Sequence, residues 1–159
     1  EGAQVALTVL RRAAALGWPE CEHLFIGMTD SDIDGVLYDM RKELDTQVAM
    51  ALIASFEAML RLDFLRRAKG RRSMPAAKKM KALSKRYGRR VALDDILDVW
   101  RVETGKQQVI AQFRNLIRYR HWLAHGRYWI QKSGMTPDPE DAWSIADALF
   151  GELPGFPPL

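Results

Sequence analysis

Two arginines and two histidines recur between residues 114 and 125 at a spacing that could support chemistry at a phosphate. At i, i+4, i+7 and i+11 they form one row on an α-helix: Arg114, Arg118, His121 and His125. Like charges on one helix face repel each other, so an anion such as a phosphate backbone would stabilise the row. Arginine holds phosphate oxygens in a bidentate geometry, and histidine can act as acid or base near neutral pH.

Arg120 lies beside this row, near the middle of the apolar face of the same predicted helix. Burying its guanidinium unpaired would cost several kcal/mol, so the side chain must reach solvent, find an acid or line a cleft. Glu57 and Asp63 are candidates to orient Arg120, although ordinary helix surface is the simpler interpretation of both acids. The apolar face comprises Val109, Ile110, Phe113, Leu116, Ile117, Leu123 and Ala124.

The stretch from Arg120 to Gly126 resembles the signature of the HEPN family, which is Arg, a polar residue, three further residues and His, often followed by Gly. In that family the motif lies late in an α-helical bundle of four or five helices, and similar motifs occur in toxin RNases and in RNA-cleaving CRISPR effectors. The resemblance therefore implies an all-α bundle and a metal-independent endoribonuclease. A toxin or antiphage effector restrained by an antitoxin partner is one form of this activity.

The resemblance implies that Arg120 and His125 are catalytic, with His121 as the polar residue of the motif. RNA supplies its own nucleophile, the 2′-hydroxyl, so the enzyme needs only to move protons and stabilise charge at phosphorus. Neither a metal nor a cofactor is implied. HEPN domains usually pair so that two motifs line one cleft, which implies a homodimer, and Trp122 is a candidate interface residue because it projects away from the apolar face.

A second register of the motif exists in the same segment. Arg114 and Asn115 followed by His121 fit the longer spacing that the family tolerates. A separation of seven residues aligns two side chains better on a straight helix than the five residues between Arg120 and His125. The residues around His125 match the family more closely, which favours the first register, but the sequence leaves both open.

Helical periodicity governs every long apolar segment, which predicts an all-α fold of one domain over residues 1–159. Apolar residues recur every three to four positions from 33 to 62, which predicts one long helix or two collinear ones ending near residue 68. Proline, glycine and aspartate mark the ends of the other elements. These are helices over about 4–16, 75–87, 93–103, 106–124 and 138–150, and an extended tail over 154–159.

The segment 66–90 carries twelve of the 24 basic residues and no acid. We expect it to be a partly helical basic insert that attracts polyanions, and nucleic acid is the commonest such partner. A solvated surface is the alternative. The residues expected to bind RNA are Lys78, Lys79 and Lys81 in this insert, together with Arg114 and Arg118.

The cysteine and histidine content limits the class of protein. A lone cysteine, Cys21, cannot form an internal disulfide, which is typical of the cytoplasm. One cysteine and three histidines are too few for the common zinc sites. The longest nearly uncharged run, residues 46–56, is shorter than the roughly 20 residues that span a bilayer, so no membrane association is expected.

Two other functions fit the same residues. A non-catalytic RNA- or nucleotide-binding module would use the same cleft without turnover. A helical interaction domain would pair Arg120 with an internal acid and would place the histidines at the negative end of their helix. Turnover separates the enzyme from the binding module, and RNA binding at moderate salt separates both from the interaction domain.

Overall fold

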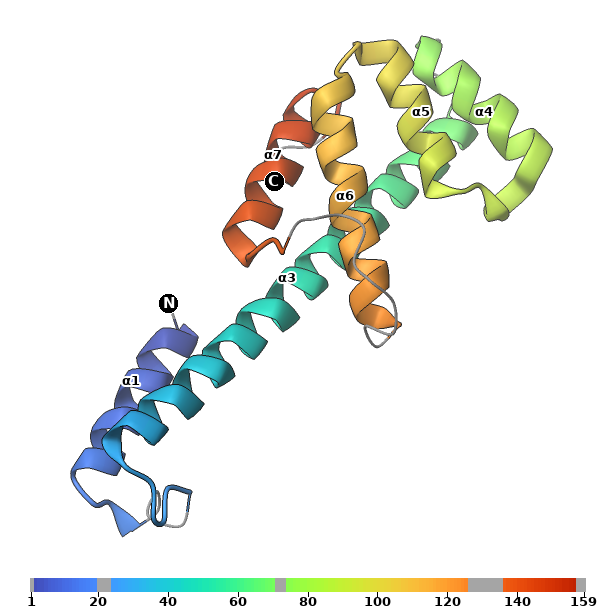
Figure 1. Ribbon diagram of the computed structural model, residues 1–159. Coiled ribbons are helices and arrows are strands. Elements are labelled where there is room, and N and C mark those ends of the chain that lie inside the picture. Colours follow the sequence, from blue (N-terminus) through green and yellow to red (C-terminus); the bar gives the residue numbers. More distant parts are fainter. Residues whose placement is uncertain (1, 20–23, 71–73, 126–135, 157–159) are drawn as a thin grey trace. The chain divides into compact units, whose positions relative to one another are not determined.

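The structure is a computed structural model that describes residues 2–19, 24–70, 74–125 and 136–156. Over this part of the chain it contains six α-helices and no strand, which confirms the all-α prediction (Figure 1). None of the described helices combines the length and hydropathy needed to cross a membrane. The elements are α1 (Gly2–Ala15), α3 (Asp30–Lys69), α4 (Pro75–Tyr87), the 3₁₀ turn η1 (Gly88–Arg90), α5 (Leu93–Thr104), α6 (Gln107–Ala124) and α7 (Pro139–Gly151).

The chain divides into two compact units, Glu1–Val48 and Ala49–Leu159. The first unit contains α1 and the beginning of α3, which are joined by ion pairs from Arg11 to Asp30 and Asp34. Its buried apolar side chains among the described residues are Ala13, Ile33 and Leu37. The division describes how contacts cluster within the chain, and a single domain over residues 1–159 stays a prediction.

The long apolar repeat forms one continuous helix, α3, which settles the alternative between one helix and two. Its first turn is capped reciprocally: the Thr29 amide donates to Asp32 Oδ2 at 2.9 Å, and the Asp32 amide donates to Thr29 Oγ1 at 3.3 Å. Hydrogen bonds from the Thr29 hydroxyl and amide hold the pKa of Asp32 below its usual value. The helix ends with Arg66, Arg67 and Lys69, whose positive charges favour its C-terminus.

The core of the second unit is built on the C-terminal half of α3, where Phe56, Leu60 and Phe64 are almost fully buried. Helix α6 packs beside α7 and contacts α5, and α5 packs beside α4 (Figure 1). Phe150 of α7 lies edge-on to Phe56, with ring centroids 5.9 Å apart. Phe113 of α6 also lies against Phe150, with ring centroids 6.1 Å apart, so Phe150 links α6 to α3 through aromatic contacts.

The helices begin and end near the proline, glycine and aspartate residues from which the sequence predicts their ends. Pro75 and Pro139 lie in the first turns of α4 and α7, and Asp138 caps α7 by accepting a hydrogen bond from the Asp141 amide at 2.8 Å. Gly105 ends α5 with φ of 69°, in the left-handed region that a side chain would disfavour. The predicted starts and ends of α4 to α7 are confirmed to within a residue or two.

An extended tail over 154–159 is not what its described part shows, since the chain turns at residues 154 and 155, and residues 157–159 lie outside the described residues. The Phe156 amide donates to the Leu153 carbonyl at 3.0 Å, and its ring stacks on Phe150 with centroids 4.4 Å apart. Arg67, which is buried in an ion pair with Asp63 at 2.6 Å, also donates to the Pro154 carbonyl at 2.9 Å. The tail therefore packs on the core through aromatic and hydrogen-bonding contacts that its proline content does not reveal.

Candidate functional site

Helix α6 carries the predicted row, and its packing determines which way that row faces. Ile110, Phe113 and Leu116 are buried in the core, so the opposite side of the helix lies at the surface. Arg114 is partly buried at the margin of this surface, whereas Arg118 and His121 are exposed. His125 is the residue directly after the helix, and its amide donates to the His121 carbonyl at 3.1 Å.

A cavity of about 270 Å³ lies between α3, the beginning of α5, and α6. This volume is near the lower end of the roughly 300–1,000 Å³ typical of small-molecule sites. Three arginines and a histidine share its wall with two acids, so cations are in excess. The charged and titratable lining residues are Glu57 and Arg61 from α3, Asp94 from α5, and Arg114, Arg118 and His121 from α6.

Glu57 connects the cavity to the motif arginine. Its Oε1 accepts hydrogen bonds from Arg61 Nε at 3.0 Å and Nη2 at 2.9 Å, and its Oε2 accepts one from Arg120 Nη1 at 3.1 Å. The Glu57 side chain is only 14% exposed, whereas that of Arg120 is 30% exposed. One shielded carboxylate therefore holds two guanidinium groups in place.

The view that Glu57 and Asp63 are ordinary helix surface is wrong. Glu57 pairs with Arg120, as expected for an orienting acid, while Asp63 pairs with Arg66 and Arg67 instead. Because Arg120 finds an acid within its own chain, its place on the apolar face no longer argues for a dimer interface there. Trp122 is partly buried and packs against the core beside Tyr119, with ring centroids 5.9 Å apart, so it does not project away from the core as expected, and its place at an interface stays a prediction.

Arg114 is held by two acids of α5. Its Nη2 donates to Asp98 Oδ1 at 2.8 Å and to the Asp94 carbonyl at 3.2 Å, and its Nε lies 3.1 Å from Asp94 Oδ1 without making a hydrogen bond. The hydrogen bond from Arg114, with the charges of Arg114 and Arg101, holds the pKa of Asp98 below its usual value. Arg114 therefore reaches the cavity with much of its charge already compensated.

Arg118 differs from the other arginines of the cavity. Its Nη1 donates to the amide oxygen of Asn115 at 3.3 Å, and it forms no ion pair with any residue that the structure describes. Its side chain is exposed at the cavity wall. Among the described residues, Arg118 is thus the cavity arginine most available to an anionic ligand.

The two motif histidines stack on each other. Their ring centroids are 6.4 Å apart and their planes differ by 14°. His121 lines the cavity, and His125 follows it by one helical turn. Gly126 and the rest of the segment 126–135 lie outside the described residues.

The residues that line the cavity are those of the second register of the motif rather than those of the first. Arg114 and His121 both line it, whereas Arg120 reaches it through Glu57, and His125 through its stacking on His121. Sequence reasoning overlooked Arg61. The i, i+4 spacing of Glu57 and Arg61 was the available signal, since such pairs meet on a helix surface.

The basic helix α4 stands apart from this cavity. Lys78, Lys79 and Lys81 are exposed on α4, as expected for a polyanion-binding surface, and none of them lines the cavity. Lys79 is paired with Glu103 at 2.8 Å, whereas Lys78 and Lys81 form no ion pair within the described part of the chain. The five residues expected to bind RNA therefore fall into two groups, one on α4 and one at the cavity.

The chain matches no family model, and no curated protein or solved structure matches it either. The resemblance to the HEPN family consequently stands on the motif of α6 and on the helical layout. Helical bundles host many unrelated activities, so the function has to be argued from the cavity and its residues.

Proposed function

We propose that the protein is a metal-independent endoribonuclease of HEPN type and that the cavity between α3, α5 and α6 holds a phosphate of its RNA substrate. The observation that carries this proposal is the shared position of Arg118 and His121 in one cavity wall. Arg118 supplies a cation without a carboxylate partner among the described residues, and His121 supplies a group that can move a proton. A phosphate flanked by a ribose hydroxyl requires both.

The reaction begins at the 2′-hydroxyl of the RNA. One histidine removes its proton, the oxygen attacks phosphorus, and the bond from phosphorus to the 5′-oxygen breaks. The second histidine donates a proton to that leaving oxygen, which yields a 2′,3′-cyclic phosphate and a 5′-hydroxyl. His121 and His125, stacked at 6.4 Å, are suited to these two roles, and arginine stabilises the charge that develops on the phosphate oxygens.

Arg120 takes part through its pair with Glu57. Its side chain is partly exposed, so a phosphate oxygen can share the guanidinium with the carboxylate. In this proposal Glu57 holds Arg120 in the orientation that stabilises the transition state at the scissile phosphate, although its charge also competes with the phosphate for the guanidinium. Arg120, His121 and His125 are the proposed catalytic residues, Arg118 binds the phosphate in the cavity, and Glu57 is a positioning residue.

The expected partners follow from the same proposal. RNA would extend from the cavity to α4, where Lys78 and Lys81 are exposed. A homodimer, an antitoxin partner and a role as a toxin or antiphage effector are parts of the proposal that the resemblance implies, and the proposed cytoplasmic location rests on the lone cysteine, Cys21.

A cleavage assay with matched arginine variants tests this function. Arg118→Gln should lower the cleavage rate of single-stranded RNA by about 10²-fold or more, because it removes charge stabilisation at the phosphate. The control is Arg12→Gln in the first unit, where Arg12 is exposed on α1 and forms no ion pair with a described residue. Equal cleavage rates for the two variants would show that the cavity is not part of the active site.

A non-catalytic RNA- or nucleotide-binding module is the second candidate. The observation that favours it is the compensation of Arg114 by Asp94 and Asp98 and of Arg120 by Glu57, which leaves less charge for a transition state. The Arg120–Glu57 pair is also what a helical interaction domain would contain. RNA binding without turnover would select the binding module, and the absence of RNA binding would select the interaction domain.

A further inference from the structure

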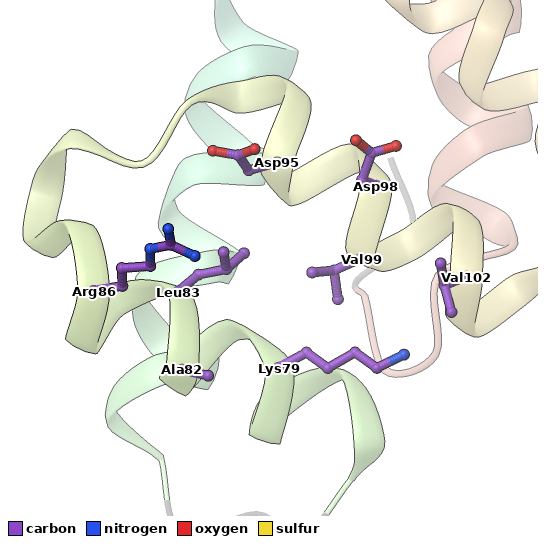
Figure 2. Close-up of a pocket in the computed structure, with 8 residues that line it drawn as sticks. All are labelled: Lys79, Ala82, Leu83, Arg86, Asp95, Asp98, Val99 and Val102. Carbon is purple, nitrogen blue, oxygen red and sulfur yellow. The ribbon is translucent and has the colours of Figure 1, made fainter.

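A second hollow, of about 410 Å³, lies between α4 and α5 and shares no lining residue with the cavity (Figure 2). We call it the α4–α5 groove. Leu83 of α4 and Val99 of α5 point toward each other across it (Figure 2). Val102 belongs to the same apolar lining and is nevertheless 64% exposed. Ala82, Leu83, Val99 and Val102 form the apolar floor of this groove, which is open enough at Val102 for an apolar side chain of a partner to reach it.

The rim of the groove carries opposite charges on its two sides. Lys79 and Arg86 project from α4, and Asp95 and Asp98 project from α5 (Figure 2). Asp95 forms no ion pair with a described residue, and the guanidinium of Arg86 lies over the Tyr87 ring, 5.0 Å from its centroid. Lys79 is already paired with Glu103, and Asp98 with Arg101 and Arg114, so Arg86 and Asp95 are the rim charges without an ion pair among the described residues. A partner for this groove therefore needs an apolar stripe with charges of both signs beside it.

The first unit of the chain carries such a stripe on α3. Met40, Leu44 and Val48 recur at i, i+4 and i+8, so they lie on one helix face, and they are 44%, 36% and 47% exposed. We call them the 40–48 row. Its flanking residues are of both signs, with acids in the majority: Asp39, Arg41, Lys42, Glu43 and Asp45.

The charges of the two units are complementary. Residues 1–48 contain nine acids and four bases, for a net charge of −5, and residues 49–159 contain eleven acids and twenty bases, for a net charge of +9. Two copies of this chain therefore attract each other when the first unit of one approaches the second unit of the other.

We propose that the α4–α5 groove binds the 40–48 row of a second copy of this chain, and that the two copies exchange their rows reciprocally. An amphipathic helix with anchors three to four residues apart is the usual occupant of an apolar groove. Reciprocal exchange uses the same pair of surfaces twice, so the assembly closes as a two-fold dimer. The proposal does not depend on RNA cleavage, because neither the groove nor the row lines the cavity.

Sedimentation of the full chain with two charge-introducing variants tests this interface. Leu44→Glu alters the row and Val102→Glu alters the groove, and both side chains are exposed enough for the fold to accept glutamate. The wild-type chain should sediment as a dimer that weakens as salt is raised from about 50 to 500 mM. Each variant should raise its dissociation constant by about tenfold or more. The control is Leu62→Glu, at a position that is 65% exposed and outside both surfaces, which should dimerise like the wild type.

Mixing the two variants gives the most specific result. The Leu44→Glu chain keeps an intact groove and the Val102→Glu chain keeps an intact row, so an equimolar mixture regains one of the two row-in-groove interfaces. We expect a heterodimer to form in the mixture at concentrations where each variant alone is monomeric, with unchanged circular dichroism. A monomeric wild type would overturn the proposal, as would a mixture that stays monomeric or a Val102→Glu chain that dimerises like the wild type.

Discussion

Glu57 of α3 and Arg120 of α6, sixty-three residues apart in the chain, meet in an ion pair at 3.1 Å. The same carboxylate binds Arg61, so the motif arginine is fixed to the long helix from which the core is built. This ion pair joins the packing of the bundle to the proposed chemistry, because whatever moves α6 against α3 also moves Arg120.

Replacing Glu57 by Gln tests this relationship. The amide keeps the shape of the side chain but removes the charge that holds Arg61 and Arg120. We expect a loss of about 1–2 kcal/mol in the free energy of unfolding, modest because both arginines reach solvent. RNA should bind more tightly, since the cavity becomes more positive, while cleavage should slow, since Arg120 is no longer oriented. Urea denaturation, RNA binding and cleavage rates report the three effects, and weaker RNA binding would contradict this account.

The interaction between Arg114 and Asp98 makes part of the stability depend on pH. The pKa of Asp98 is lowered in the folded chain, chiefly by the hydrogen bond from Arg114. The folded state therefore binds this proton less readily than the unfolded state, and the stability gained is complete above the unfolded pKa of about 3.9 and is lost as the pH falls through the folded pKa. Asp98→Asn should destabilise the protein at neutral pH, and its difference from wild type should shrink below about pH 4.

Asp95→Asn is the matched control for that measurement, because Asp95 lies one turn away on α5 and forms no ion pair with a described residue. Its stability should stay close to that of the wild type throughout. If Asp98→Asn differs from wild type equally at about pH 3 and pH 7, the ion pair with Arg114 does not contribute in the way described.

The lysines of α4 should differ from one another in their effect on RNA binding. Lys78 and Lys81 form no ion pair with described residues, whereas Lys79 is held by Glu103 at 2.8 Å. The double change Lys78→Gln and Lys81→Gln should flatten the slope of log affinity against log salt by about 0.7–0.9 for each phosphate that the protein no longer neutralises. Lys79→Gln should change the slope less. Equal slopes for wild type and the double variant would show that α4 does not contact RNA and is an ordinary solvated surface.

Histidine variants decide which register of the motif is catalytic. His121 lines the cavity and His125 stacks on it, so each should slow cleavage by about 10² to 10⁴-fold when changed to alanine if both transfer protons. Loss of activity in His121→Ala alone would select the Arg114 and His121 register. Loss in His125→Ala alone would select Arg120 and His125. Full activity in both variants would remove the motif from the reaction.

The helices were predictable from the sequence because their signals are local. Pro75, Gly105 and Asp138 act on the backbone within one turn, so the ends of their helices can be placed without knowing the fold. The pair of Glu57 with Arg120 could be offered only as one of two interpretations, since the sequence does not show that α6 packs on α3 and brings Arg120 near Glu57 rather than near Asp63. The turn at Phe156 also depends on tertiary packing, because the Phe156 ring stacks on Phe150 of α7.

The end groups of cleaved RNA test the proposed function most directly. Wild-type protein should cut single-stranded RNA in the presence of a chelator and should leave a 2′,3′-cyclic phosphate, or its hydrolysed form, and a 5′-hydroxyl. A single 2′-deoxy substitution at the cut site should abolish that cut, because the nucleophile is missing. RNA that is bound but never cut, a 5′-phosphate end of the kind that two-metal nucleases commonly leave, or cutting that proceeds at the deoxy site would contradict the account.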